Sequence, residues 1–82
     1  MATVILSKNA EKEFSHLSKK EQKKIIKKLT ALRDNPFLGK KLTGKLRGLL
    51  SYRAWPYRII YESQQKNTVV VHKISHRQRA YK

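Results

Sequence analysis

Several residues in the second half of the chain have side chains suited to chemistry at phosphate. Arg53 and Arg58 lie in a stretch rich in aromatic and β-branched residues, Leu49–Glu62, and His76 precedes Arg77 near the end of the sequence. A guanidinium is a planar fork of hydrogen-bond donors that stays charged, so it matches the oxygen atoms of a phosphate. A histidine side chain can accept or donate a proton near neutral pH. These residue types predict a site for a phosphodiester.

Cleavage of RNA without a metal ion would use such groups. The 2′-hydroxyl attacks its own 3′-phosphate and forms a 2′,3′-cyclic phosphate, which requires a base, cations for the charged phosphorane and an acid for the 5′-oxygen. The candidate catalytic residues are Arg53, Arg58, His76, Arg77 and Tyr81. The candidate RNA contacts are Lys45, Arg47, Trp55 and Arg79. The alternative that the same residues permit is a basic sheet that binds nucleic acid without cleaving it.

The strongly positive net charge indicates that the binding partner is negatively charged. Twenty Lys and Arg against five Asp and Glu give a formal net charge of +15 in 82 residues. Such a field attracts polyanions, which leaves nucleic acid, an anionic membrane surface or an acidic protein as candidates. Clear helix and strand periods in the apolar residues argue against a disordered basic tail.

Scarce acidic residues and the absence of cysteine exclude several kinds of site. Without cysteine there is no disulfide and no thiolate zinc site. Glu62 stands alone in its stretch and no acid follows it, which excludes a paired-carboxylate glycosidase and a carboxylate-bound metal. His16 and His72 lack ligand spacing and are interpreted as structural. We therefore expect no metal and no cofactor. No apolar run approaches the roughly 20 residues of a membrane span, so we expect a cytoplasmic protein.

The first quarter of the chain predicts a strand followed by a helix. Thr3–Ser7 is a short apolar run of strand length. Asn9 is the expected N-cap of a helix over Ala10–Leu17. The apolar stripe of that helix is Ala10, Phe14 and Leu17, spaced i, i+4 and i+7.

A longer second helix is predicted from Ser18 to about Arg33. Ser18 and Glu21 match a capping box, and the helix should end before Pro36 because the residue preceding proline disfavours helical dihedrals. Its apolar stripe is Ile25, Leu29 and Leu32, broadened by Ile26. Six lysines are expected to cover its outer face, either as an ordinary solvated surface or as a basic surface for RNA: Lys19, Lys20, Lys23, Lys24, Lys27 and Lys28.

A β-hairpin is predicted to carry the two arginines. Pro56 has no N–H to donate to a central ladder, so the stretch is divided into strands Leu49–Ala54 and Tyr57–Ser63 around a Trp55-Pro56 turn. Because side chains alternate between faces, Arg53 and Arg58 should lie on neighbouring strands close to that turn.

The remaining segments complete an α+β domain. Asn35–Lys45 is predicted to be a loop in which Phe37 and Leu38 pack under the sheet. Thr68–Ile74 is the most apolar segment and is predicted to be a central strand. The resulting order, β-α-α-β-β-β, describes two helices packed on an antiparallel sheet in a single domain over residues 1–82.

Several short motifs in this order resemble one family. They are Leu32-Arg33-Asp34-Asn35-Pro36, Lys41-Leu42-Thr43-Gly44, Tyr52-Arg53, Tyr57-Arg58-Ile59-Ile60-Tyr61, and His76-Arg77 ending at Tyr81. Each motif is weak alone, but their order and spacing are similar to those of the RelE/ParE superfamily of toxins from type II toxin–antitoxin modules, over nearly the whole chain.

The resemblance implies a fold, a target and partners. The family fold has the same β-α-α-β-β-β order. RelE-like members cut messenger RNA in the ribosomal A site, whereas ParE-like members poison DNA gyrase. The RelE-like activity is the one predicted here, with gyrase inhibition as the alternative. The implied partners are an acidic RelB-like antitoxin, the ribosome and mRNA, with operator DNA bound only through the toxin–antitoxin complex and no membrane.

The resemblance also implies residue roles. Arg58 resembles the phosphate-stabilising arginine of the RelE-like branch, Arg77 its second arginine, and Tyr81 its C-terminal tyrosine, which stacks on or protonates the substrate. Arg53 resembles the first of two strand lysines, and Trp55 falls at the second lysine position. Since arginine hardly ever loses its proton, it is a poor general base, and His76 is the expected substitute.

Overall fold

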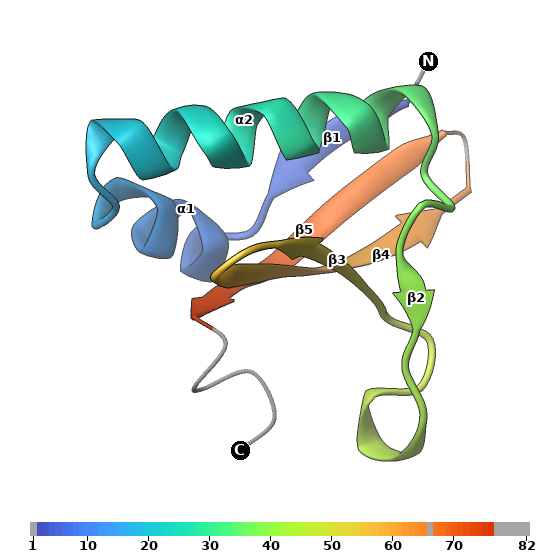
Figure 1. The fold of residues 1–82 in the computed structure, drawn as a ribbon. Coiled ribbons are helices and arrows are strands. Elements are labelled where there is room, and N and C mark those ends of the chain that lie inside the picture. The colour runs from blue at the N-terminus through green and yellow to red at the C-terminus, as the bar shows by residue number, and fades with distance from the viewer. Residues whose placement is uncertain (1, 66, 77–82) are drawn as a thin grey trace.

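The chain folds into two helices and five strands. A computed structural model describes residues 2–65 and 67–76. The elements are β1 (Thr3–Leu6), α1 (Lys8–Ser15), α2 (Lys19–Asp34), β2 (Lys40–Lys41), a 3₁₀ helix (Gly44–Leu46), β3 (Leu50–Ala54), β4 (Tyr57–Gln64) and β5 (Thr68–His76). Both helices lie on the same face of the sheet (Figure 1). No helix in the described residues has the length and apolar character needed to cross a membrane.

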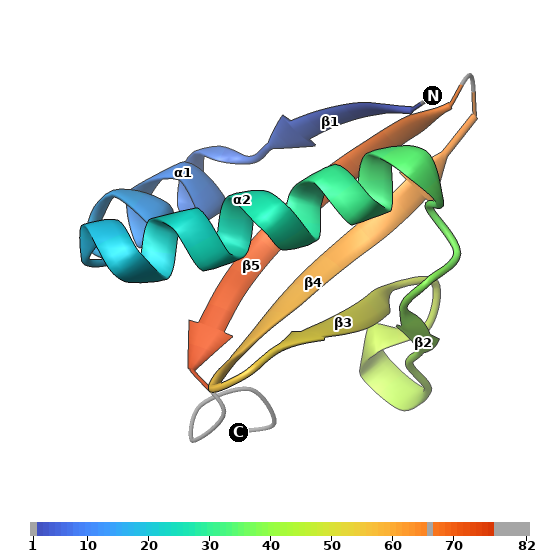
Figure 2. The same cartoon turned by 45° about the horizontal axis from the view of Figure 1, so that its top comes forward.

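The sheet has the order β1-β5-β4-β3-β2 (Figure 2). Three strand pairs are antiparallel, namely β5 with β4, β4 with β3, and β3 with β2. The fourth pair, β1 with β5, is parallel. The predicted α+β class is confirmed, with two differences. The β1–β5 pair is parallel, and β2 adds a two-residue edge strand inside the predicted loop. β5 is an interior strand as predicted, although β4 occupies the middle of the sheet.

Serine side chains cap both helices. The Ser7 hydroxyl accepts a hydrogen bond from the Ala10 amide at 3.1 Å, so α1 begins two residues earlier than predicted and Asn9 lies inside it. The Ser18 hydroxyl accepts from the Glu21 amide at 3.2 Å, as the capping pattern predicts for α2. Each cap satisfies one backbone donor that the first helical turn leaves without a partner.

The core lies between the helices and one face of the sheet. Ile25 and Leu32 of α2 are fully buried and Leu29 packs against them, as the helical period predicts. Three apolar residues predicted to be buried are exposed instead: Ile26 by 52%, Phe37 by 73% and Leu38 by 44%. The sequence shows that these three residues are hydrophobic. It does not show that other side chains fill the core positions next to them.

Tyr61 of β4 occupies the space beneath the connection from α2 to β2. Its hydroxyl donates to the Pro36 carbonyl at 2.7 Å and accepts from the Gly39 amide at 2.9 Å. The ring is fully buried, and desolvation raises the pKa of Tyr61 above its ordinary value. Tyr61 therefore holds the backbone of this connection through two hydrogen bonds, and the side chains of Phe37 and Leu38 remain exposed.

Strand register divides the sheet into two faces. The helix-facing residues belong to the core, namely Leu50, Tyr52, Ala54, Tyr57, Ile59, Tyr61, Val69, Val71 and Ile74. The alternate positions form a second face, which we call the helix-free face, and a break in the register adds His72 to it. Its residues include Lys40, Ser51, Arg53, Arg58, Ile60, Glu62, Val70, His72, Lys73 and Ser75. Any chemistry carried by the two arginines belongs to this second face.

Candidate nucleic-acid interface

Arg53 and Arg58 stand directly opposite each other on β3 and β4. They are paired in the strand register, and only the pair Ala54 and Tyr57 separates them from the hairpin turn. Arg53 is exposed and Arg58 is partly buried. Each guanidinium can donate two parallel hydrogen bonds to phosphate oxygens, so the pair suits a phosphate bound over both strands.

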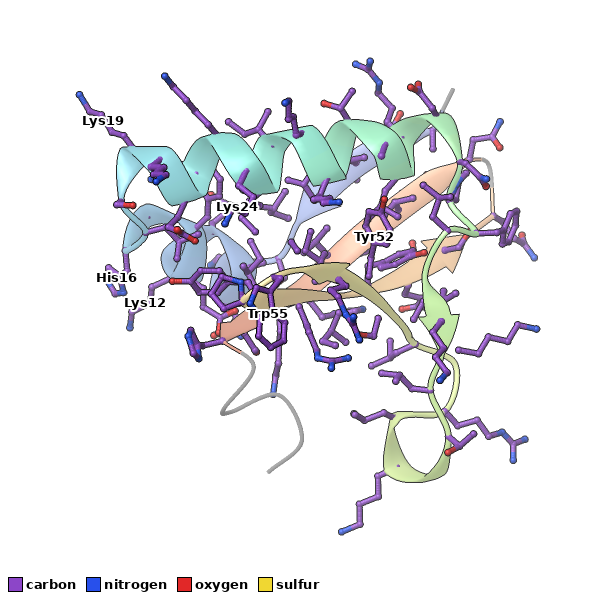
Figure 3. All side chains as sticks on the ribbon, viewed as in Figure 1. Lys12, His16, Lys19, Lys24, Tyr52 and Trp55 are labelled. Carbon is purple, nitrogen blue, oxygen red and sulfur yellow. The ribbon has the colours of Figure 1, made fainter. Side chains whose placement is uncertain are left out.

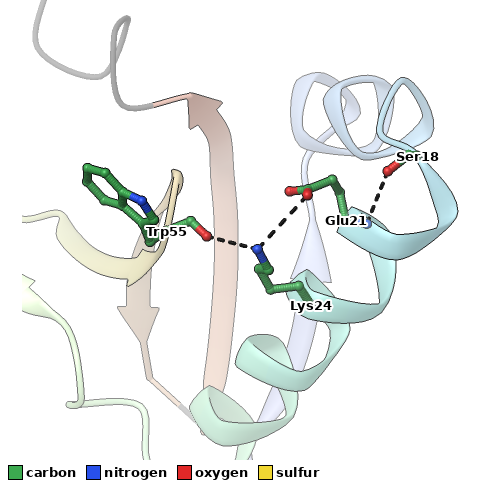
Figure 4. Close-up of polar contacts among 4 residues, drawn as sticks. All are labelled: Ser18, Glu21, Lys24 and Trp55. Atoms are coloured by element: carbon green, nitrogen blue, oxygen red, sulfur yellow. Dashed lines mark hydrogen bonds and ion pairs between the residues drawn. The ribbon is translucent and has the colours of Figure 1, made fainter.

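The hairpin turn beside the arginines is held by α2. The Lys24 ammonium donates to the Trp55 carbonyl at 3.1 Å and lies 4.0 Å from Glu21 Oε1 (Figure 4). The Lys28 ammonium lies 5.4 Å from the centre of the Tyr52 ring, in a cation–π arrangement. Two of the six lysines predicted on the outer face of α2 therefore point toward β3. Figure 3 shows this contrast between Lys24, near the sheet, and Lys19, which extends away from it.

His76 lies on the other face of the sheet from the arginines. It pairs with Tyr57, and the two rings meet edge to face with centroids 5.4 Å apart. Tyr57 packs against the core on the helix side. His76 also lines a cavity of about 730 Å³ between α1 and the end of β5, together with Glu13 and His16. The structure does not bring His76 together with Arg53 and Arg58, because neighbouring strand residues alternate between faces.

The other predicted site residues lie in three parts of the chain. Lys45 and Arg47 are exposed in and after the 3₁₀ helix, on a loop that projects beyond the β2–β3 edge of the sheet (Figure 1). Trp55 is 52% exposed at the hairpin turn. Three predicted residues lie outside the described residues, namely Arg77, Arg79 and Tyr81.

One titratable pair on the helix-free face was not predicted. His72 Nε2 lies 3.2 Å from Glu62 Oε1, and both side chains are partly exposed. A break in the register places His72 there, because Ile60 pairs with Lys73 while Tyr61 pairs with Val71. The sequence does contain a signal of that break: core positions 69 and 71 keep the two-residue strand period, but the next is Ile74, one residue late.

No cluster of three or more His, Cys, Asp or Glu side chains that could hold a metal ion is present within residues 2–65 and 67–76. In the part of the chain that the structure describes, the charged and titratable groups of the helix-free face include the guanidiniums of Arg53 and Arg58, the ammoniums of Lys40 and Lys73, and the imidazole of His72 paired with a carboxylate. Such a set can bind a phosphate, stabilise added negative charge on it and exchange a proton beside it.

Comparison with known proteins identifies the family. Residues 4–81 match the family described as "ParE toxin of type II toxin-antitoxin system, parDE". The chain belongs to this family. The match spans nearly all of the sequence and confirms the resemblance to the RelE/ParE superfamily. No curated protein sequence matches the chain significantly.

Solved structures show that this toxin has a RelE-like fold. A chain of the toxin–antitoxin complex RelBE2 from Mycobacterium tuberculosis superposes with a TM-score of 0.85 and 26% identity, over 92% of this chain and 96% of that one. The isolated RelE toxin of E. coli gives 0.81 and 20%, over 99% and 89%. A chain of the YoeB–YefM complex from Staphylococcus aureus gives 0.78 and 22%, over 93% and 97%. The protein is thus a type II toxin–antitoxin toxin with the RelE/YoeB-like fold.

Proposed function

We propose that this toxin is a ribosome-dependent endoribonuclease that cleaves mRNA and thereby inhibits translation. Cleavage proceeds by attack of the 2′-hydroxyl on the adjacent phosphate and yields a 2′,3′-cyclic phosphate. The observation that carries the proposal is the Arg53–Arg58 pair, in register on the helix-free face. Both guanidiniums can bind the scissile phosphate, and their fixed charge stabilises the additional negative charge of the phosphorane.

Other basic residues extend the substrate contact beyond this pair. In the proposal Arg77 and Tyr81 complete the catalytic set, as the family resemblance implies. Contacts outside the scissile phosphate come from Lys45, Arg47, Trp55 and Arg79. The net charge of +15 supplies a long-range attraction for mRNA and ribosomal RNA.

The proposed inhibitor is an acidic RelB-like antitoxin. Structural neighbours include complexes with an antitoxin, among them RelBE of E. coli and RelE–RelB of Pyrococcus horikoshii, at 18% and 24% identity. A surplus of Asp and Glu on the antitoxin would complement the positive surface of the toxin. Operator DNA is then contacted only through the toxin–antitoxin complex, and the site of action is the cytoplasm.

Inhibition of DNA gyrase is the second candidate function. The observation that favours it is the family match, whose description names ParE toxins. A gyrase poison acts through surface contact with its target, so its effect would not require that each arginine stabilise a transition state. The two functions therefore differ in the nucleic acid that is broken inside the cell.

Primer extension on cellular mRNA after induction of the toxin tests the proposal. We expect new 5′ ends within translated codons soon after induction. The same cuts should be absent when Arg53→Ala and Arg58→Ala are combined. They should persist when Lys23→Ala and Lys27→Ala are combined, a matched loss of two positive charges on the exposed side of α2. Intact mRNA accompanied by broken chromosomal DNA would instead establish the gyrase alternative.

A further inference from the structure

The pair formed by His72 and Glu62 is the feature of the helix-free face that the arginines do not explain. His72 Nε2 and Glu62 Oε1 are 3.2 Å apart, and their side chains are 38% and 39% exposed. A histidine held by a carboxylate through one ring nitrogen keeps its other ring nitrogen available for a proton. This arrangement is the one that a general base requires.

A β-bulge in β5 brings His72 to this face. Val71 and Ile74 both belong to the core, so the two residues between them, His72 and Lys73, are directed away from the helices. Without the extra residue, strict alternation would place one of them in the core. The bulge is anchored at the start of α1, because the His72 carbonyl accepts from the hydroxyl of the N-cap residue Ser7 at 3.1 Å and from the side-chain amide of Asn9 at 3.4 Å. Bulges commonly redirect a side chain beside an active site.

The pair shares its face with Arg53 and Arg58. Along β4 the order on this face is Arg58, Ile60 and Glu62, and His72 falls between the positions that pair with Ile60 and Tyr61. At about 3.3 Å per residue, the His72 position lies about 8 Å from the arginine row. The long side chain of Arg58 can extend over part of that distance, and a general base at His72 requires that one ribose-phosphate unit reach both groups.

We propose that His72 is the general base of RNA cleavage and that Glu62 is its positioning residue. This inference rests on the proposed ribonuclease function. The 2′-hydroxyl transfers its proton to Nδ1 of His72 while the bond between the 2′-oxygen and phosphorus forms. The bond between phosphorus and the 5′-oxygen then breaks, and the 5′-oxygen takes up a proton from water. The imidazolium returns its proton to water, and no oxidant or metal takes part.

His72 is better placed to act as the general base than the two other candidates, Arg53 and His76. Arg53 is on the correct face but keeps its proton at any physiological pH. His76 can exchange a proton but is directed to the helix side, against Tyr57. Among the described residues, His72 is the imidazole that shares a face with both guanidiniums. Lys73, exposed on the same face, adds a cation beside the reacting phosphate.

Single-turnover cleavage of mRNA on programmed ribosomes tests the inference. We expect His72→Gln and His72→Ala each to cleave about a hundredfold more slowly than the wild type while ribosome binding is retained. Added imidazole should restore part of the rate in His72→Ala, whose missing ring leaves space for it, and should not accelerate the wild type. His16→Gln, which removes an exposed histidine on the helix side, is the matched control and should cleave at the wild-type rate.

A double-mutant cycle tests the role of Glu62. Glu62→Gln should lower the rate in the wild-type background and have no further effect in the His72→Ala background, because its contribution passes through the imidazole. Independent, additive losses would contradict that role. Wild-type cleavage in both His72 variants, or a loss confined to His76→Gln, would overturn the inference while leaving the proposed function intact. A wild-type protein that cuts no RNA would instead refute the proposed function itself.

Discussion

At the scale of single residues, the arginine pair determines what the helix-free face can do. Arg53 and Arg58 lie opposite each other with no acidic residue in their rows of the register, since their neighbours on that face are Ser51, Ile60 and Ser75. Two guanidiniums in register on one face of a sheet present two planar sets of donors, which suits a phosphate bound over both strands.

Replacement of Arg58 should distinguish catalysis from simple binding. Arg58→Ala should lower single-turnover cleavage by about a hundredfold, equivalent to about 3 kcal/mol of transition-state stabilisation. Arg58→Lys keeps the charge but loses the planar fork, and we expect it to recover only a small part of the rate. Ribosome binding, measured by co-sedimentation, should fall much less because many lysines share that contact. Equal losses in binding and in cleavage would show that Arg58 only holds the substrate.

At the scale of elements, the features predictable from sequence are those with local causes. The Ser18 cap, the buried face of α2 and the turn at Trp55-Pro56 depend on residues close together in the chain, and all three are observed. The opposition of Arg53 and Arg58 follows from the short hairpin, which fixes its own register. Local patterns in the sequence therefore predicted the arginine pair of the candidate site but not the His72–Glu62 pair.

The features that were missed depend on contacts between distant segments. The parallel pairing of β1 with β5 joins residues about 65 positions apart, as in Thr3 with Thr68. The direction of Lys24 depends on where β3 lies beneath α2, and the place of His72 depends on a bulge anchored by Ser7. A periodic pattern identifies the apolar face of each element. It does not specify which distant strand will pair with that element or which distant carbonyl will accept its side-chain hydrogen bonds.

Tyr61 provides a pH-dependent link between β4 and the segment that leads to β2. Burial raises the pKa of Tyr61 in the folded state, so the protonated phenol stabilises the folded state relative to the unfolded one. This stabilisation is fully present below the pKa of the unfolded chain, about 10. As the pH rises above that value, the unfolded chain releases the proton first and the free energy of unfolding decreases. Tyr61→Phe should lack this decrease between about pH 9 and about pH 11 in urea titrations.

The same substitution has a cost at neutral pH that serves as a second measurement. Without the hydroxyl, the Pro36 carbonyl and the Gly39 amide lose a partner, which should lower stability by about 1–3 kcal/mol. Parallel pH profiles for the wild type and Tyr61→Phe would contradict a titration of Tyr61 coupled to folding.

At the scale of the whole molecule, the helices and the candidate site lie on opposite faces of the sheet, and both sides carry positive charge. The helices cover one face and leave the other to the arginine pair, Lys73 and the His72–Glu62 pair. Lysines on the exposed turns of α2 add to the field without entering either site. An excess of fifteen positive charges on 82 residues means that a polyanionic partner is attracted before any specific contact forms.

This field should set the rate at which an acidic antitoxin captures the toxin. We expect the association rate constant, measured by stopped flow with the cognate antitoxin, to fall steeply between about 50 and about 500 mM salt, because screening shortens the range of the attraction to a few ångströms. The dissociation rate constant should change far less, since it reports the contacts formed after docking. Lys19→Gln combined with Lys23→Gln removes two exposed charges of α2 and should slow association at low salt only. An association rate that is constant across this range of salt, or unchanged by that pair of substitutions at low salt, would show that the surplus charge does not guide the antitoxin and acts on nucleic acid alone.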